Sequence, residues 1–267
     1  MRPTSGSGAS GREGTLSVMS YNIQGHAAVL SRRYLAGVAR AIRDARPDVV
    51  GLQEVHRGTW ASRFADQVEM LAEATGMEAC FGRSLAYRTG EYGNALLTRG
   101  RPLETEVRCL PGEAERRSLL CCRVELDGAP LEVFVTHLAA WGRLGRTTRL
   151  RQARYIASHL AAADGPFVLA GDLNAPPGAP ELAPLLGHRH LSLCGRPREA
   201  THRLMRQRLD YVFAGPSFRE VGSRVLRAGP SDHLPVVASL RREAPAAARE
   251  RCEDASWGWP EAAARAG

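Results

Sequence analysis

The sequence predicts an α/β fold built from mixed β-sheets. Segments with strand-like and helix-like apolar patterns interleave along most of the 267 residues. In the middle of the chain, several strand-like segments follow one another without a helix between them. Interleaved elements favour an α/β architecture, whereas consecutive strands favour antiparallel pairs, so we expect mixed rather than purely parallel sheets. The chain is 44% hydrophobic and 24% charged, which is ordinary for a globular protein with one large core.

The first quarter of the chain reads as strand, helix, strand, helix. Alternating apolar residues predict a strand over 15–22, and a helical apolar stripe predicts a helix near 31–46. Residues 47–54 read as a short buried strand. A second helix is expected next, because four apolar residues recur at spacings of four, four and three. These residues, expected on its buried face, are Trp60, Phe64, Val68 and Leu71.

The rest of the chain is rich in strands, with one long helix expected over 146–162. Before this helix, the apolar patterns predict strands over 78–87, 92–99, 103–110, 118–126 and 131–138. After it, a short continuous apolar run predicts a buried strand over 166–174. The last predicted strands are 209–215, 218–226 and 234–240.

The two ends of the chain differ in composition from the part between them. Residues 1–14 are rich in Ser and Gly, and we expect them to be disordered. Residues 242–267 are rich in Ala and Arg without an apolar stripe, and we expect them to form a mobile tail. A single domain is therefore expected over 15–241.

Composition also bounds the cellular setting. The sequence shows neither a signal-peptide pattern nor an apolar run long enough for a membrane span, so we expect a cytoplasmic monomer. The six cysteines show no CxxC spacing, which favours free thiols over a disulfide framework. The net charge is +8 and every basic residue is an arginine. Arginines concentrate in 141–154 and 196–208, but this charge alone does not separate nucleic acid from a small anionic substrate.

Polar residues recur at the ends of the predicted strands. At or just after carboxyl ends of strands lie Asn22, Glu54, His137, Asp172 and Asn174. At or just before amino ends lie Asp210, Asp232 and His233. If the later strands run antiparallel to the earlier ones, both sets reach the same edge of the core. Unpaired buried acids cost roughly several kcal/mol each, so such a cluster needs a cation or a shared hydrogen-bond network.

Short motifs at these positions occur in an order that is typical of a known family. They read YNI (21–23), LQEV (52–55), YGNALLTR (92–99), VTHL (135–138), GDLN (171–174), LDYVF (209–213) and SDHLPV (231–236). Over residues 15–240 the chain therefore resembles the endonuclease/exonuclease/phosphatase superfamily. The resemblance implies a four-layered α/β sandwich of the DNase I type, with two packed mixed β-sheets flanked by helices. It also implies phosphoester hydrolysis with a divalent cation, usually Mg²⁺, with Mn²⁺ as the alternative.

The resemblance implies a metal role for part of the candidate residues. Glu54 resembles the principal metal carboxylate of the family, and Asn22 lies where the family has an amide close to the metal and the phosphate. Asp232 resembles the secondary acid on the metal side. Oxygen ligands of this kind suit Mg²⁺, which keeps several of its waters and needs only one or two carboxylates.

The other candidate residues resemble the catalytic groups of the family. Asp172 resembles the acid that positions or deprotonates the attacking water, and Asn174 its neighbour that contacts the phosphate. His233 resembles the imidazole at the phosphate, oriented by Asp210. His137 matches the histidine of the phosphatase, sphingomyelinase and DNase-like branches. Positioning and charge neutralisation dominate phosphoryl transfer, so these residue types suit the reaction.

The sequence leaves the substrate open. His137 stands where abasic-site endonucleases of the family carry a Tyr-containing segment, which disfavours abasic DNA. The remaining candidates are a nucleic-acid phosphodiester and a phosphorylated lipid or sugar headgroup. A nuclease that follows the nucleic-acid backbone with the arginines of 141–154 is one alternative, and a catalytically silent binding module on the same scaffold is another. Arg88 and Arg117 are secondary candidates for contact with the phosphate.

Overall fold

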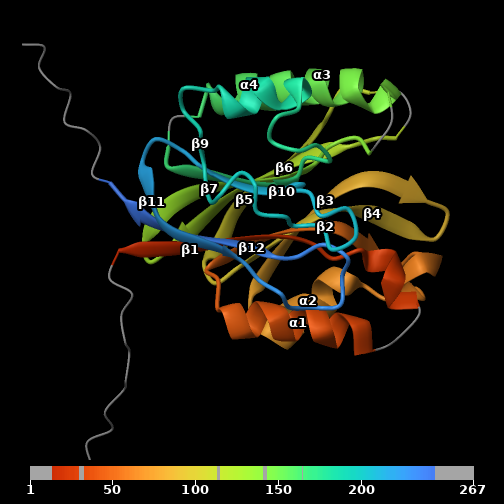
Figure 1. The fold of residues 1–267 in the computed structure, drawn as a ribbon. Helices are drawn as coiled ribbons and strands as arrows, with labels where there is room; N and C mark the ends of the chain where they lie inside the picture. Colours follow the sequence, from red (N-terminus) through yellow and green to blue (C-terminus); the bar gives the residue numbers. More distant parts are fainter. Residues whose placement is uncertain (1–13, 30–32, 113–114, 141–142, 164, 244–267) are drawn as a thin grey trace, which may run out of the picture.

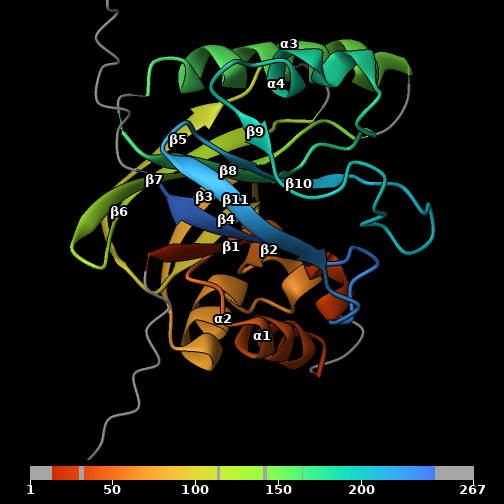
Figure 2. The same ribbon diagram turned by 60° about the vertical axis from the view of Figure 1, so that its left-hand side comes forward.

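The computed structural model describes residues 14–29, 33–112, 115–140, 143–163 and 165–243. Its strands form two six-stranded sheets that stack face to face. Helices α1 (Arg33–Ala45) and α2 (Gln67–Thr75) cover the outer face of one sheet. Helices α3 (Arg143–Leu160) and α4 (Ala183–Leu186) cover the outer face of the other. Figures 1 and 2 show the resulting four layers, which confirm the predicted sandwich.

Both sheets are mixed, as the sequence predicts. The first has the order β11 (Phe218–Val225), β12 (Val236–Arg242), β1 (Thr15–Asn22), β2 (Val49–Arg57), β4 (Gly90–Thr98) and β3 (Glu78–Tyr87). The second has the order β5 (Arg101–Cys109), β6 (Ser118–Leu126), β7 (Ala129–His137), β8 (Phe167–Asp172), β10 (Asp210–Ala214) and β9 (Ser192–Leu193). Each sheet has one parallel pair at its centre, β1 with β2 and β7 with β8, between antiparallel strands.

The alternation of side chains along the strands divides the interior into three apolar layers. On β1, Val18 faces the opposite sheet and Met19 faces α1 and α2. On β8, Val168 faces the opposite sheet and Leu169 faces α3 and α4. Successive side chains of a strand point to opposite faces, so a central strand covered on both sides is a continuous apolar run. This burial fixes the strand register on which the positions of the polar strand ends depend.

The prediction of a helix that buries Trp60 and Phe64 is wrong for the first half of that helix. Phe64 adopts a left-handed backbone conformation with φ of 65°, which a continuous α-helix does not tolerate. Helix α2 begins only after Asp66, whose carboxylate accepts hydrogen bonds from the first backbone N–H groups of the helix. Trp60 and Phe64 are accordingly 72% and 61% exposed. Val68 and Leu71 are buried as predicted.

Most of the two terminal segments for which we made predictions lies outside the described residues. Strand β1 begins at Thr15 and β12 ends at Arg242. The predicted tail 242–267 therefore begins too early, because Arg242 still belongs to β12; residues 1–13 and 244–267, on which the rest of the predicted disordered start and mobile tail fall, are not among those described. The cysteines that the structure describes are free thiols. Among the described helices, none has the length and apolar character that crossing a membrane requires.

Candidate active site

The strand register brings the predicted site residues to one edge of the sandwich. His137 ends β7 and pairs with Asp172, which ends the parallel neighbour β8. Asp210 begins the antiparallel strand β10 and pairs with Asp172 from the other side. In the first sheet, Asn22 at the end of β1 pairs with the residue that precedes Glu54. The later strands therefore run antiparallel to the earlier ones and reach the same edge, as the sequence predicts.

The Asn22 amide joins the two sheets. Its Nδ2 donates to Oε1 of Glu54 at 2.9 Å in its own sheet and to Oδ2 of Asp172 at 2.9 Å in the other. Glu54 reaches this amide because β2 bulges between Leu52 and Val55 and the backbone of Glu54 is left-handed, with φ of 59°. Such a conformation is strained for a glutamate and persists only where the surroundings hold it. The bulge therefore aims a carboxylate out of a regular strand into the site.

Asn174 fixes both a carboxylate and an imidazole. Its backbone N–H donates to Oδ1 of Asp172 at 2.9 Å. Its side-chain Nδ2 lies 3.0 Å from the carbonyl oxygen of Leu138 and 2.9 Å from Nε2 of His137. Because that nitrogen donates, His137 accepts at Nε2 and carries its proton on Nδ1. Burial lowers the pKa of His137 well below its ordinary value, so the ring is neutral.

His233 is the opposite case, an imidazole that keeps its charge. Its Nδ1 lies 2.9 Å and 3.1 Å from the two carboxylate oxygens of Asp210, and its Nε2 lies 3.7 Å from Oδ2 of Asp172. Burial by itself would lower the pKa of His233, but these two carboxylates raise it to about 10. Burial in turn raises the pKa of Asp172, the acid nearest to the free edge of the ring. The site thus holds one neutral and one cationic imidazole.

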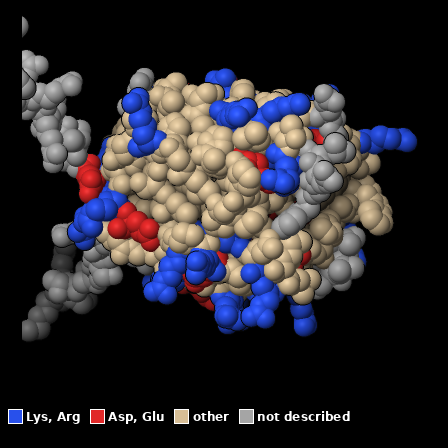
Figure 3. Space-filling model, turned by 45° about the horizontal axis from the view of Figure 1, so that its top comes forward, with Lys and Arg blue, Asp and Glu red and all other residues tan. Residues whose placement is uncertain are grey.

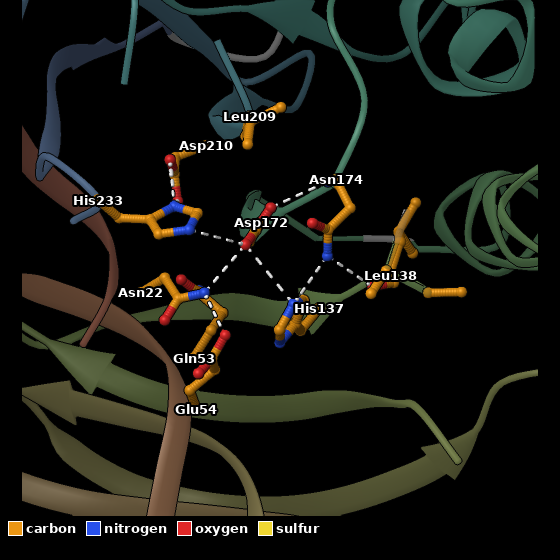
Figure 4. A network of polar contacts seen from close by, with 12 residues as sticks. Asn22, Gln53, Glu54, His137, Leu138, Asp172, Asn174, Leu209, Asp210 and His233 are labelled. Atoms are coloured by element: carbon orange, nitrogen blue, oxygen red, sulfur yellow. Dashed lines mark hydrogen bonds and ion pairs between the residues drawn. The ribbon is translucent and has the colours of Figure 1, made fainter. Parts of the chain in front are cut away.

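Asp232 lies beside this network. Its Oδ2 accepts a hydrogen bond from Nε2 of Gln24 at 3.1 Å and lies 3.5 Å from Nε2 of His202. The carboxylate is 28% exposed. Figure 4 shows that the other predicted residues face one another: Asn22, Glu54, His137, Asp172, Asn174, Asp210 and His233. All eight predicted residues therefore lie at this edge, with Asp232 at its margin.

The sequence interpretation missed three contributors to the site: Gln24, His202, and His26, whose Nδ1 lies 3.6 Å from Oε2 of Glu54. Gln24 comes two residues after the end of β1, so its position next to a strand-end asparagine is a signal that the sequence contains. His202 lies outside any strand and 30 residues before Asp232 in the sequence numbering. Only the fold shows the contact between His202 and Asp232. This contact depends on an isolated antiparallel bridge between His202 and His233.

The donor set fits a hard divalent cation. Glu54 is 21% exposed. Burial by itself would raise its pKa, but the His26 ring 3.6 Å away and the hydrogen bond from Asn22 lower the pKa to about 2, so the carboxylate is ionised. Two groups of side chains have ligand atoms within 4.8 Å of one another, and Glu54 belongs to neither: they are His202, Asp232 and His233, and Asp172, Asp210 and His233, whose shared member His233 is the cationic ring. Carboxylate oxygens are the ligands that Mg²⁺ and Mn²⁺ prefer.

Arg117 lies buried near these residues, whereas Arg88 is exposed in the turn between β3 and β4. Nη2 of Arg117 donates to Glu115 at 2.8 Å, but its Nε and Nη1 are buried without a partner among the described residues. Nδ1 of His137 is likewise buried without a partner in the described part of the chain. The charge of Arg117 adds to burial in lowering the pKa of His137, which places the two side chains near each other. Buried donors of this kind call for an acceptor.

Comparison with known proteins assigns the chain to a family of phosphoester hydrolases with a two-sheet sandwich. The sequence model of the Endonuclease/Exonuclease/phosphatase family matches residues 19–233. The chain belongs to this family, whose members act on phosphoesters. It is 30% identical to YbhP of Escherichia coli (strain K12), a protein named as uncharacterized, over 172 residues. That match covers 59% of this chain and 66% of the relative, just under two thirds of its length.

Several solved structures share the fold. A family member from Beutenbergia cavernae has a TM-score of 0.70 at 27% identity, covering 85% of this chain and 72% of the other. A mannosyl-6-phosphatase of Bacteroides thetaiotaomicron has a TM-score of 0.68 at 18% identity, covering 84% and 99%. TDP2 of D. rerio, in complex with a single-strand DNA product, has a TM-score of 0.68 at 19% identity, covering 85% and 99%. One fold thus serves a sugar phosphatase and a protein that binds a DNA product, so the fold does not define the substrate.

Proposed function

We propose that this protein is a phosphoester hydrolase that depends on Mg²⁺, with Mn²⁺ as an alternative cation. The observation that supports this most directly is the Asn22 amide, which holds Glu54 of one sheet and Asp172 of the other within one hydrogen-bond network. A purely structural network would have no need of a strained, partly exposed and ionised glutamate at its edge. A cation bound by that carboxylate accounts for it.

Glu54, Asn22 and Asp232 are the residues that would hold the cation. When bound, the cation neutralises charge on the phosphate and lowers the pKa of a coordinated water. Oδ1 of Asn22 already accepts the backbone N–H of Gln24 at 2.9 Å, which fixes the orientation of the amide. The carboxylates of Glu54 and Asp232 are the partly exposed acids of the set, so they are the ones that a solvated cation reaches.

The remaining residues bind the phosphate and move the proton. His233, held cationic by Asp210, donates to the phosphate and stabilises the negative charge that develops on it. Asp172 accepts the proton of the attacking water, because its raised pKa makes it a stronger base than an exposed aspartate. The unpartnered N–H groups of His137 and Arg117 are the donors that suit the phosphate oxygens.

The contacts of the arginine-rich stretches in the structure support a nuclease less strongly than their sequence does. Arg149 of α3 is buried and binds Glu181 at 2.8 Å and the carbonyl oxygens of Ala139 and Ala140. Arg208 likewise donates to backbone carbonyl oxygens. Figure 3, in which the α3–α4 layer comes forward, shows arginines in separate groups with wide stretches of other residues between them. We therefore favour a compact phosphorylated substrate, such as a sugar or lipid headgroup, over a polynucleotide.

Hydrolysis of bis-p-nitrophenyl phosphate and p-nitrophenyl phosphate tests the proposed function. We expect turnover with Mg²⁺ or Mn²⁺ and none in EDTA, and we expect Glu54→Gln and His233→Gln each to lower kcat at least about 100-fold. Glu125→Gln is the matched control, because Glu125 lies in an exposed ion pair with Arg101. Full activity in EDTA or in Glu54→Gln would contradict the proposal.

A substrate panel separates the alternatives. Cleavage of DNA or RNA with steep salt dependence would favour the nuclease over the headgroup hydrolase. Turnover of sugar or lipid phosphates without nucleic-acid cleavage would support the preference stated above. No turnover of nucleotides, nucleic acids, lipids or sugar phosphates with any divalent cation would favour the catalytically silent binding module.

A further inference from the structure

His202 makes a contact with each of its ring nitrogens. Nδ1 accepts the backbone N–H groups of Leu204 at 3.3 Å and Met205 at 3.2 Å. A ring nitrogen that accepts carries no proton, so the proton of His202 is on Nε2. The protonated Nε2 lies 3.5 Å from Oδ2 of Asp232. The loop after His202 therefore sets the tautomer that presents a donor to this carboxylate.

Two donors converge on one oxygen of Asp232. Besides the His202 ring, Nε2 of Gln24 donates to Oδ2 at 3.1 Å. The other oxygen, Oδ1, lies 3.5 Å from the hydroxyl of Ser231, which also lies 2.9 Å from the carbonyl oxygen of Asn22. A hydroxyl has one proton, and the shorter contact takes it. Oδ1 is therefore the oxygen that this arrangement leaves for a further ligand.

His202 itself is not suited to bind the cation, although its metal-binding atoms lie within 4.8 Å of those of Asp232 and His233. To bind a cation through Nε2, the neutral ring would have to carry its proton on Nδ1. Two backbone N–H groups already point at Nδ1. The ring is also buried, with its centroid 4.7 Å from that of His233 at an angle of 70°. This packing against His233 holds the His202 ring in place beside Asp232.

We propose that His202 is a positioning residue, which together with Gln24 holds Asp232 with Oδ1 presented to the divalent cation. The proposal rests on the proposed function and adds to it a residue that touches neither phosphate nor metal. Loss of the Nε2 donor releases the carboxylate to rotate, so it weakens cation binding without removing a ligand. Outer partners of this kind change metal affinity by about 10- to 100-fold when they are lost.

Two variants separate the two contacts of the ring. In His202→Gln, the side-chain amide nitrogen takes the place of the Nε2 donor, and the acceptor for the loop is lost. In His202→Asn, the side-chain oxygen takes the place of the Nδ1 acceptor, and the donor to Asp232 is lost. Binding of Mn²⁺ to the metal-free, full-length protein, followed by electron paramagnetic resonance of unbound Mn²⁺, measures the effect. We expect the Kd for Mn²⁺ to rise about tenfold in His202→Asn and to stay within about twofold in His202→Gln.

The opposite pattern overturns the proposal. If His202→Asn binds Mn²⁺ as the wild type does, or if both variants lose affinity equally, the ring only supports the loop that follows it. Gln24→Ala removes the second donor to the same oxygen and should also weaken Mn²⁺ binding. This variant tests the arrangement independently if a His202 variant does not fold. A wild-type protein that binds no Mn²⁺ would instead overturn the proposed function itself, so the two failures are distinguishable.

Discussion

Asp172 and Asp210 show how neighbours set the charge of a single residue at this site. Both carboxylates are buried, and they lie on opposite sides of the His233 ring. The pKa of His233 rises to about 10 because these acids outweigh the effect of burial. His137, which lacks a comparable pair, is held neutral by burial. One imidazole is therefore cationic, whereas the other is neutral and carries an N–H donor.

The raised pKa of His233 predicts that the stability of the metal-free protein falls with pH. The folded protein keeps this proton up to about pH 10, whereas an unfolded histidine loses it near pH 6.5. The stability that the charged ring contributes is complete below pH 6.5 and is lost as the pH rises toward 10. Chemical denaturation in EDTA should show the free energy of unfolding falling over this range, and falling less in His233→Gln. Parallel pH curves for the two proteins would contradict the account.

Strand boundaries are the elements that the sequence predicts best. The predicted strands 15–22, 78–87 and 118–126 coincide with β1, β3 and β6. Strand β2 continues three residues past the predicted end at Glu54, because the bulge there places a polar, left-handed residue inside a strand. The eight residues selected from the strand ends all lie at one edge of the sandwich, with Asp232 at its margin. The strand-end pattern could not locate His202, whose contact with Asp232 depends on a loop conformation rather than on a periodic pattern.

The clearest error of the sequence prediction concerns the start of helix α2, and the corrected start can be tested by mutation. Apolar spacing alone could not show that Phe64 is left-handed or that Asp66 caps the helix. Because Phe64 is 61% exposed and Leu71 is buried, Phe64→Ala should change the free energy of unfolding by less than about 0.5 kcal/mol. Leu71→Ala should cost about 2 to 5 kcal/mol. Urea denaturation measures both free energies of unfolding. A large loss of stability in Phe64→Ala would instead support the continuous helix predicted from the sequence.

The stability of the whole molecule depends on how closely the two sheets pack against each other. A Cβ atom added at Gly51 on β2 would lie 2.7 Å from Cβ of Ala170 on β8 and 3.2 Å from the methyl groups of Val135 on β7. Gly51→Ala should therefore destabilise the protein by about 1 to 3 kcal/mol. Gly222→Ala on the edge strand β11 is the control, because nothing lies within 4 Å of its added Cβ. Denaturation curves compare the two variants, and equal stability losses would contradict the close packing.

The same packing links stability to function. The Asn22 amide bonds Glu54 in one sheet and Asp172 in the other at 2.9 Å each, so the spacing of the sheets sets the spacing of the site. A Gly51→Ala protein that remains folded should then hydrolyse p-nitrophenyl substrates more slowly than Gly222→Ala. The two sheets lie stacked in Figure 1, and their spacing arises from side-chain packing between segments far apart in the sequence, so the sequence alone does not predict it.

The central claim is that Glu54, Asn22 and Asp232 hold one divalent cation at the edge where the two sheets meet. Crystals of the metal-free protein soaked in Mn²⁺ test it through the anomalous scattering of the metal. We predict an anomalous peak in direct contact with the carboxylate of Glu54, on the side that faces Asn22 and Asp232. A peak bound elsewhere, or Glu54 without a metal in crystals that have taken up Mn²⁺, would contradict the account.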